Sequence, residues 1–305
     1  LPHLCKEIYK LLITGKGWLV IAVVVFITIF ICNSQKVIYS DDEKKKDEYY
    51  QEYGGKDYSG FTEIIELRKA EVKEAAEKLE EAQEQFEKGE IDENTVSKYV
   101  YNYMDSTRLL DSMNEYMEQI NYVEEVNAQY GIEAYVMSQR GYNQILGDNA
   151  KIRKLIIYII LGFGIVLIAE SENALEYKSG MNMLLGSSAR GRIWGKAVKS
   201  GAVCIIAAII AVIVNITEMS VMSHTYGMPY IDAPLISLSF MKVGKMLRYI
   251  TIKQYMIMQL GVYILYSLLV SIETMAVSRY IFKKNSNREV PLLIVLNTIV
   301  LFIII

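Results

Sequence analysis

The sequence is poor in cysteine, histidine and proline, and each shortage excludes a class of protein. Its three cysteines, Cys5, Cys32 and Cys204, are widely separated, which excludes a disulfide scaffold and a cysteine-rich metal site. Its two histidines, His3 and His224, lie at distant positions and provide no acid–base pair. The four prolines and the lack of a Ser/Gly-rich tract argue against a disordered linker. We therefore predict no catalytic residue, no metal site and no cofactor in this chain.

The formal net charge of −3 is the sum of a strongly acidic region and a basic remainder of the chain. Residues 33–150 contain 13 Lys and Arg against 27 Asp and Glu, a net of −14, and the rest of the chain has a net of +11. Outside this acidic block lie apolar runs too long for a water-soluble fold of this size. They exclude a soluble enzyme and indicate a membrane protein, for which we expect contact with membrane lipid and none with nucleic acid.

A membrane-spanning helix needs about 20 apolar residues, because the hydrocarbon core is about 30 Å thick and the helix must satisfy its own backbone groups. Five segments approach this length: 17–32, 152–169, 197–216, 255–277 and 291–305. The fifth stops with the sequence, and the sequence begins at Leu1 rather than at a methionine, so we expect further residues at both ends. The predicted fold class is an all-α, polytopic membrane protein with about six transmembrane helices, five of them visible.

Residues 1–16 precede the first segment and show apolar residues at helical spacing between charged ones. This pattern predicts a short amphipathic helix on the membrane surface. The lysines of this stretch would also suit a signal peptide, but residues 30–33 provide no small-x-small cleavage site. We therefore predict that segment 17–32 is an uncleaved anchor.

The distribution of Lys and Arg in the short loops predicts the orientation. Basic residues cluster before the first segment and in the loops 170–196 and 278–290, which should be cytoplasmic. The protein would then lie in the plasma membrane with a cytoplasmic N-terminus, and segments 33–151 and 217–254 would lie outside. Lys151, Arg153 and Lys154 run against this rule.

Residues 33–151 should form an extracellular domain built on an antiparallel helical hairpin with a coiled-coil seam. Apolar residues recur at steps of four and three in both arms, Gly89 stops the first arm, and Asp92 or Asn94 can cap the second. The predicted seam comprises Phe61, Ile65, Val72, Ala75, Leu79, Ala82 and Phe86, then Val96, Tyr99, Tyr103, Leu110, Met113, Met117 and Ile120. Arms of about 28 residues would project on the order of 40 Å. A structural stalk and a sensing or substrate-handling domain both fit this pattern.

The loop 170–196 carries the strongest functional pattern. Acidic residues are followed by glycine, two leucines, small residues and a basic end. The residues concerned are Glu170, Glu172, Glu176, Gly180, Leu184, Leu185, Arg190, Arg192 and Lys196. This order resembles the loop between the second and third transmembrane helices of bacterial type-2 ABC transporter permeases. The resemblance covers the organisation of the whole chain, but single residues only in this loop.

The resemblance implies that a coupling helix from about Glu176 to Ser187 docks on a separate ATPase subunit. The protein would then be the permease of an exporter of a peptide, an antimicrobial or a hydrophobic compound. Two ATPase subunits would bind ATP and Mg²⁺, and a second permease, the same or a homologous chain, would complete the complex. Residues 191–197 do not form a phosphate-binding loop, because Ala197 lacks the required hydroxyl. A simpler interpretation of the loop is a basic segment that anchors topology.

Polar residues inside the predicted membrane segments are Asn215, Gln259, Glu273 and Asn297. They could line a transport path, but contacts between helices are the commoner role of such residues. Glu273 is close enough to the end of its segment to pair with Arg279. The alternative function is a non-transporting surface protein whose extracellular hairpin binds a partner while its helices serve as an anchor.

Overall fold

A computed structural model describes residues 2–37, 47, 50–178, 194–241 and 243–281 of the chain. These residues are helical or in turns and loops, and they contain no strand, only two isolated bridge pairs, Gly55 with Val136 and Pro234 with Thr251. The all-α prediction is therefore confirmed for the described residues. The chain divides into two compact units. The membrane unit comprises 1–37, 140–227 and 254–305, and the hairpin unit comprises 38–139 and 228–253.

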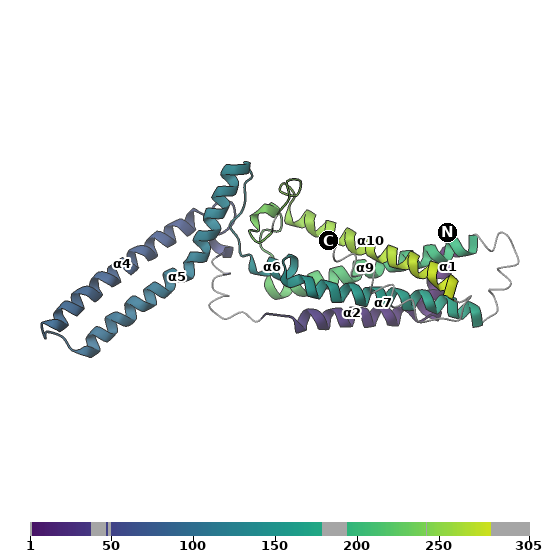
Figure 1. Cartoon of the computed structure of the whole chain (residues 1–305), viewed down its shortest axis with the longest axis horizontal. Coiled ribbons are helices and arrows are strands. Elements are labelled where there is room, and N and C mark those ends of the chain that lie inside the picture. The colour runs from purple at the N-terminus through teal and green to yellow at the C-terminus, as the bar shows by residue number, and fades with distance from the viewer. Residues whose placement is uncertain (1, 38–46, 48–49, 179–193, 242, 282–305) are drawn as a thin grey trace. The chain divides into compact units, whose positions relative to one another are not determined.

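Four helices of the described chain are long and apolar enough to cross a membrane. The helices are α2 (Gly17–Ser34), α7 (Asn149–Lys178), α9 (Lys196–Tyr226) and α10 (Ile252–Ile281) (Figure 1). Each contains one of the first four predicted segments, whereas 291–305 lies outside the described residues. The predicted loop 217–254 begins with helix, because α9 continues to Tyr226. The short helix α6 (Arg140–Leu146) precedes α7 and packs against it.

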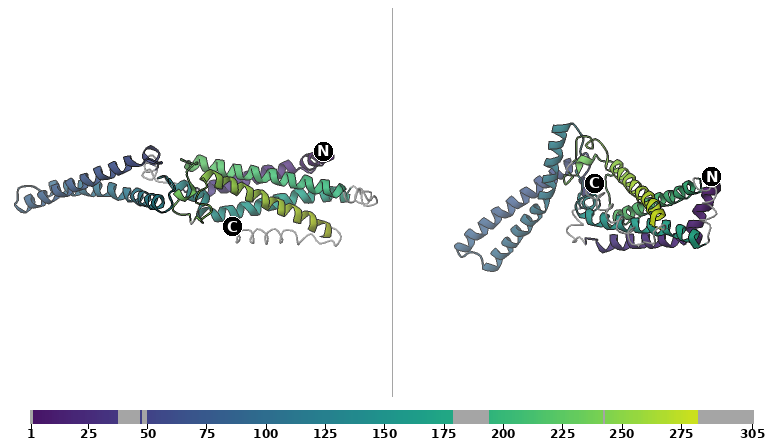
Figure 2. Two further views of the ribbon diagram at one scale, coloured as in Figure 1. Left: turned by 90° about the horizontal axis from the view of Figure 1, so that it is seen from above. Right: turned by 45° about the vertical axis from the view of Figure 1, so that its right-hand side comes forward.

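Consecutive helices of the membrane unit run in opposite directions, as Figures 1 and 2 show. Helix α2 packs against α7 and α9. A β-carbon on Gly164 of α7 would lie 2.7 Å from Val24 Cγ2 of α2, so these two helices approach closely because one of them lacks a side chain there. We call the connector end the end of the unit where α2 ends, α7 begins, α9 ends and α10 begins. There the Val37 amide donates to the Tyr226 hydroxyl at 2.9 Å.

The predicted N-terminal helix 1–16 corresponds to α1 (Pro2–Tyr9) and the π-helix η1 (Lys10–Thr14). Lys16 follows in a left-handed conformation with φ 56°, which separates this segment from α2. Leu11 is fully buried and α1 packs against α9. The segment is thus part of the membrane unit, at the end opposite the connector end. Its position on a membrane surface stays a prediction.

The hairpin unit contains α4 (Ser59–Glu87) and α5 (Glu93–Tyr130), which pack along each other. Gly89 turns the chain with φ 73°, a conformation that glycine adopts without strain. Asp92, one of the two predicted caps, accepts a hydrogen bond from the Thr95 amide at 3.1 Å. The helical hairpin is therefore observed. Its extracellular location and a coiled-coil geometry stay predictions.

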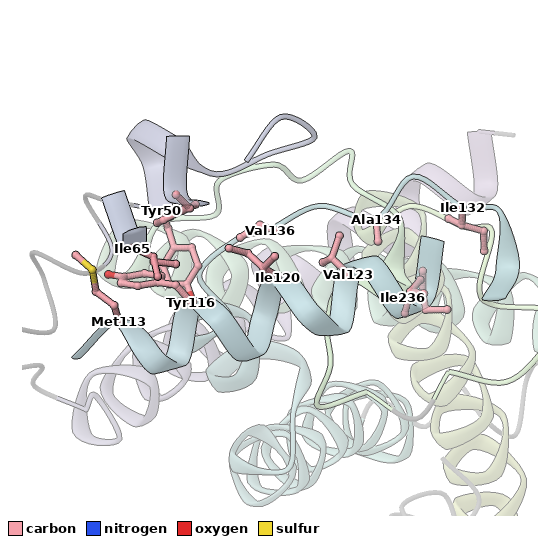
Figure 3. Packing of buried hydrophobic residues seen from close by; sticks show 12 residues of the cluster. Tyr50, Ile65, Met113, Tyr116, Ile120, Val123, Ile132, Ala134, Val136 and Ile236 are labelled. Atoms are coloured by element: carbon pink, nitrogen blue, oxygen red, sulfur yellow. The ribbon is translucent and has the colours of Figure 1, made fainter. Parts of the chain in front are cut away.

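The core of the hairpin unit lies near Tyr116 of α5 (Figure 3). The rings of Tyr50 and Phe61 lie 4.5 and 4.9 Å from the ring of Tyr116, centroid to centroid. Towards the turn the hairpin has little core, and Phe86 at the end of the predicted seam is 46% exposed. The segment Met228–Lys253 adds Ile236 to the core and a hydrogen bond of 2.9 Å from the Tyr230 hydroxyl to the Gly54 carbonyl.

Candidate functional site: a buried polar cluster in the membrane unit

The structure describes only part of the predicted coupling loop. Glu170, Glu172 and Glu176 belong to the last turns of α7, so the acidic start of the loop continues a membrane helix. Lys196 is the first residue of α9 and is exposed. Five of the predicted coupling residues lie outside the described residues, namely Gly180, Leu184, Leu185, Arg190 and Arg192. The docking role of the loop therefore stays a prediction.

The polar residues predicted inside the membrane segments have different environments. Asn215 is buried on α9, and its Nδ2 atom has no hydrogen-bond partner in the described part of the chain. Gln259 on α10 accepts a hydrogen bond from Lys154 on α7, with Nζ to Oε1 at 3.1 Å. Glu273 is exposed, and Asn297 lies outside the described residues. Of these residues, Gln259 therefore joins two helices directly.

A buried polar cluster of Arg153, Glu218 and Tyr263 joins α7, α9 and α10. Arg153 Nε donates to Glu218 Oε1 at 3.0 Å, and the Tyr263 hydroxyl donates to Glu218 Oε2 at 2.7 Å. Arg153 Nη2 also donates to the backbone carbonyl of Gln144 at 2.7 Å. The Arg153 and Glu218 side chains are 1% and 0% exposed. The cluster therefore places a fully desolvated ion pair among three membrane helices.

The hydrogen bonds of the polar cluster explain how it tolerates burial. An isolated charge removed from water costs several kcal/mol, and an ion pair offsets this cost only when its geometry is good and its remaining donors and acceptors are satisfied. Here both carboxylate oxygens of Glu218 accept a hydrogen bond, and Arg153 donates from two nitrogens. Apolar residues could hold the helices together at lower cost, so packing alone does not require this cluster.

Next to the polar cluster lies a cavity of about 450 Å³ between the start of α7 and the first turns of α10. We call it the α7–α10 cavity. Tyr158 and Val262 contribute to a largely apolar wall, and Lys151, Lys154 and Gln259 provide polar groups. Its volume lies within the usual range for small-molecule sites of about 300–1,000 Å³.

Side-chain contacts connect α10 to the rest of the described membrane unit. The rings of Tyr158 and Tyr263 stack with centroids 4.6 Å apart. The Tyr266 hydroxyl donates to the Tyr158 carbonyl at 3.0 Å, and Ser271 Oγ lies 3.2 Å from Cys204 Sγ. Among the described residues, the contacts of α10 with its neighbours are therefore made by specific side chains.

Arg153 and Glu218 are not among the predicted site residues, although two signals in the sequence point to them. Arg153 and Lys154 violate the expected charge distribution, and the structure shows both interacting inside the unit rather than at its surface. Glu218 continues the buried face of α9, four residues after Val214 and four before Met222. A carboxylate on the buried face of one helix, together with an arginine that departs from the positive-inside rule on another, predicts an ion pair.

No group of His, Cys, Asp or Glu in the described residues has the arrangement of a metal site. The chain matches no protein-family model, no curated protein and no solved structure. The class of the protein therefore follows from its own structure, which is helical and contains four apolar helices of membrane-spanning length in its described part. Such helices indicate a membrane protein.

Proposed function

We propose that this chain is the permease subunit of an ATP-driven transporter, an ABC exporter, with ATP hydrolysed on a separate subunit. The observation that carries the proposal is the buried polar cluster beside the α7–α10 cavity. A bundle that only anchors a surface domain requires apolar packing, whereas ionisable residues inside membrane helices characteristically mark a path or a moving contact.

The resemblance of loop 170–196 supplies the link to ATP. The loop joins α7 to α9, and both helices contribute a charged member to the polar cluster. Force applied to the loop by an ATPase subunit would act on both helices and could change their contacts with α10. This mechanism is a population shift between two arrangements of the unit, driven by the nucleotide state of the partner.

Cysteine labelling tests whether the cavity changes with nucleotide state. Tyr255→Cys would be placed in the cavity wall of a protein whose native Cys5, Cys32 and Cys204 are replaced by serine. In native membranes, ATP with orthovanadate should change the rate at which a water-soluble maleimide labels this position. Tyr101→Cys, on an exposed position of the hairpin unit, is the matched control and should label at the same rate in both conditions. If the labelling rate of Tyr255→Cys is the same with and without ATP and orthovanadate, as it is for the control, the transporter proposal is refuted.

Affinity purification tests the ATPase partner. We expect an ATPase subunit to co-purify from native membranes and to be lost in the double variant Glu176→Gln with Leu184→Ala, which should still insert in the membrane. Glu77→Gln, on an exposed position of α4, is the control and should retain the partner. Loss of the partner in the control, or its retention in the double variant, would contradict coupling through this loop.

The exposed apolar side chains of the hairpin favour a second candidate function. Tyr101 and Met104, one turn apart on α5, are 71% and 64% exposed, which suits a surface that binds a partner protein. In that case the chain would be a membrane-anchored surface protein without transport. It would purify without an ATPase, and the labelling of Tyr255→Cys would not respond to nucleotide.

A further inference from the structure

We propose that the α7–α10 cavity binds an amphipathic anion, with Lys154 as the counter-charge for its acidic group. The ligand would be the transported compound only if the proposed function holds. Binding itself needs neither ATP nor an ATPase.

Among the described residues, the charges around the cavity leave one positive charge without an ionic partner. Arg153 and Glu218 neutralise each other, and the second oxygen of Glu218 is taken by Tyr263. Lys154 makes one hydrogen bond within the described part of the chain, to the neutral Gln259 amide. An ammonium group has three donors, so two of them remain for a ligand.

Lys151 also lines the cavity, but it has an acidic partner. Its Nζ lies 2.7 Å from Asp148 Oδ1, and both side chains are largely exposed. This pair leaves no net charge at the outer part of the cavity. Of the two lysines that the structure describes there, Lys154 is therefore the one without an acidic partner, within a largely apolar wall.

A lysine in such surroundings favours an anion, because a charge removed from water is stabilised by a close opposite charge. A cationic ligand would be repelled, and a neutral apolar ligand would leave the lysine unpaired. Gln259 fixes the ammonium at the α10 side, which orients its remaining donors. The acidic group of the ligand would be a carboxylate, a phosphate or a sulfate, since each accepts several hydrogen bonds.

The rest of the wall accommodates an apolar body. Met258 and Val262 come from α10, Leu146 from the end of α6, and Tyr158 from α7. The Tyr158 ring stacks on the Tyr263 ring, so both rings are held in place. The ligand is therefore an amphiphile with one acidic group, either an anionic lipid of the bilayer or a free amphipathic acid.

The test is binding of 11-(dansylamino)undecanoic acid to the purified protein in phosphatidylcholine nanodiscs, without nucleotide. Lys154→Met should weaken binding about tenfold or more, the loss expected for a desolvated charge pair. Lys154→Arg retains the charge and should restore most of the affinity. Lys78→Met is the control, because it removes a lysine that has an acidic partner and does not line the cavity, and it should bind as the original protein does.

A second variant and a second ligand keep the proposal falsifiable if Lys154→Met folds poorly. Val262→Trp places a bulky ring in the cavity and leaves Lys154 in place, so it should weaken binding. The methyl ester of the same probe lacks the charge and should bind weakly to every variant. Unchanged binding in Val262→Trp, or equal binding of acid and ester to the original protein, would overturn the proposal.

Nanodiscs that contain phosphatidylglycerol distinguish the two sources of the ligand. If the lipid headgroup occupies the site, phosphatidylglycerol will compete with the probe in the original protein. If the ligand is a free acid, the affinity for the probe will be the same in both lipids. Either result supports an anion site. Binding of the probe together with nucleotide-independent labelling of Tyr255→Cys would retain the site and reject the transporter.

Discussion

The two units of the chain contain ion pairs of similar geometry in opposite surroundings. On the hairpin, Lys78 Nζ lies 2.6 Å from Glu74 Oε1, and the two side chains are 56% and 66% exposed. In the membrane unit, Arg153 Nε lies 3.0 Å from Glu218 Oε1, and both side chains are buried. Loss of one partner of the shorter pair should cost little, because water already solvates both charges, whereas loss of one partner of the buried pair leaves an uncompensated charge. Burial rather than distance therefore decides what such a pair does.

The exposed pair of Lys78 and Glu74 affects only its own helix. Its hydrogen bond with Lys78 lowers the pKa of Glu74, and the same contact raises the pKa of Lys78. The partners are four residues apart on one helix, so the pair supports α4 without connecting it to another element. The buried pair joins helices whose residues are 65 positions apart in the sequence. Its loss should therefore disturb the whole membrane unit.

The largest effect is expected from Glu218→Leu. The substitution leaves Arg153 buried without its carboxylate, which should lower the free energy of unfolding by about 3–5 kcal/mol. Adding Arg153→Met removes the unpaired charge, so the double variant should recover much of this loss. Thermal unfolding in detergent measures both. A double variant as unstable as Glu218→Leu would show that packing, not charge, explains the effect.

The aromatic core of the hairpin unit should be the next most sensitive. Tyr116→Ala removes a ring that contacts Tyr50 and Phe61 and should cost about 3 kcal/mol. Tyr101→Ala on the same helix is the control, because its side chain is 71% exposed. Chemical denaturation followed by circular dichroism compares the two variants. Equal losses would show that the cluster around Tyr116 is not the core of the unit.

A smaller effect is expected where α2 and α7 approach closely. Gly164→Ala places a methyl group against the stiff Val24 side chain and should destabilise the unit by about 1 kcal/mol. Gly261→Ala on α10 is the control, because no heavy atom lies within 4 Å of the added carbon. It should be neutral or slightly stabilising. Thermal unfolding in detergent should separate the two variants, and a neutral Gly164→Ala would contradict the close approach.

The smallest effect is expected at the cap of α5. Hydrogen bonds from the hydroxyl and the amide of Thr95 lower the pKa of Asp92. Because the pKa is lower in the folded state, the stabilisation is present above the unfolded pKa and is lost as the pH falls through the folded value. Asp92→Ala should therefore lower the melting temperature slightly at neutral pH and not at strongly acidic pH.

The cap variant has a matched control and a clear failing outcome. Lys78→Ala removes one partner of the exposed pair and should leave the melting temperature unchanged. A circular-dichroism melt at several pH values measures both variants. A loss in Asp92→Ala that stays constant down to acidic pH would exclude the carboxylate as its cause.

Much of the fold follows from local pattern. Residues 17–32 and 197–216 are apolar over the length of a membrane helix, and each lies within a helix of the structure. The steps of four and three around Phe61 and Ile65 predict the buried face of α4, and Gly89 marks the turn. Such signals depend on neighbours in the sequence, so they can be recognised without the tertiary structure.

The candidate site is only partly predictable from the sequence. Gln259 stands out as a polar residue inside a membrane segment, but its partner Lys154 stands out only as an exception to the charge rule. Glu218 falls in the predicted loop 217–254 because the apolar run stops before it, whereas α9 continues to Tyr226. Hydropathy alone does not distinguish a buried carboxylate such as Glu218 from a polar loop residue. The predicted segment 197–216 therefore ends before the helix does.

The sequence by itself determined that the chain is helical, where its apolar helices lie and where the hairpin turns, since backbone hydrogen bonding and side-chain spacing act over a few residues. Only the tertiary structure decided that Arg153, Glu218 and Tyr263 meet. These residues come from three helices, and each is unfavourable in an apolar interior until the other two are in place. The cluster is therefore a property of the assembled unit, and so is the cavity beside it.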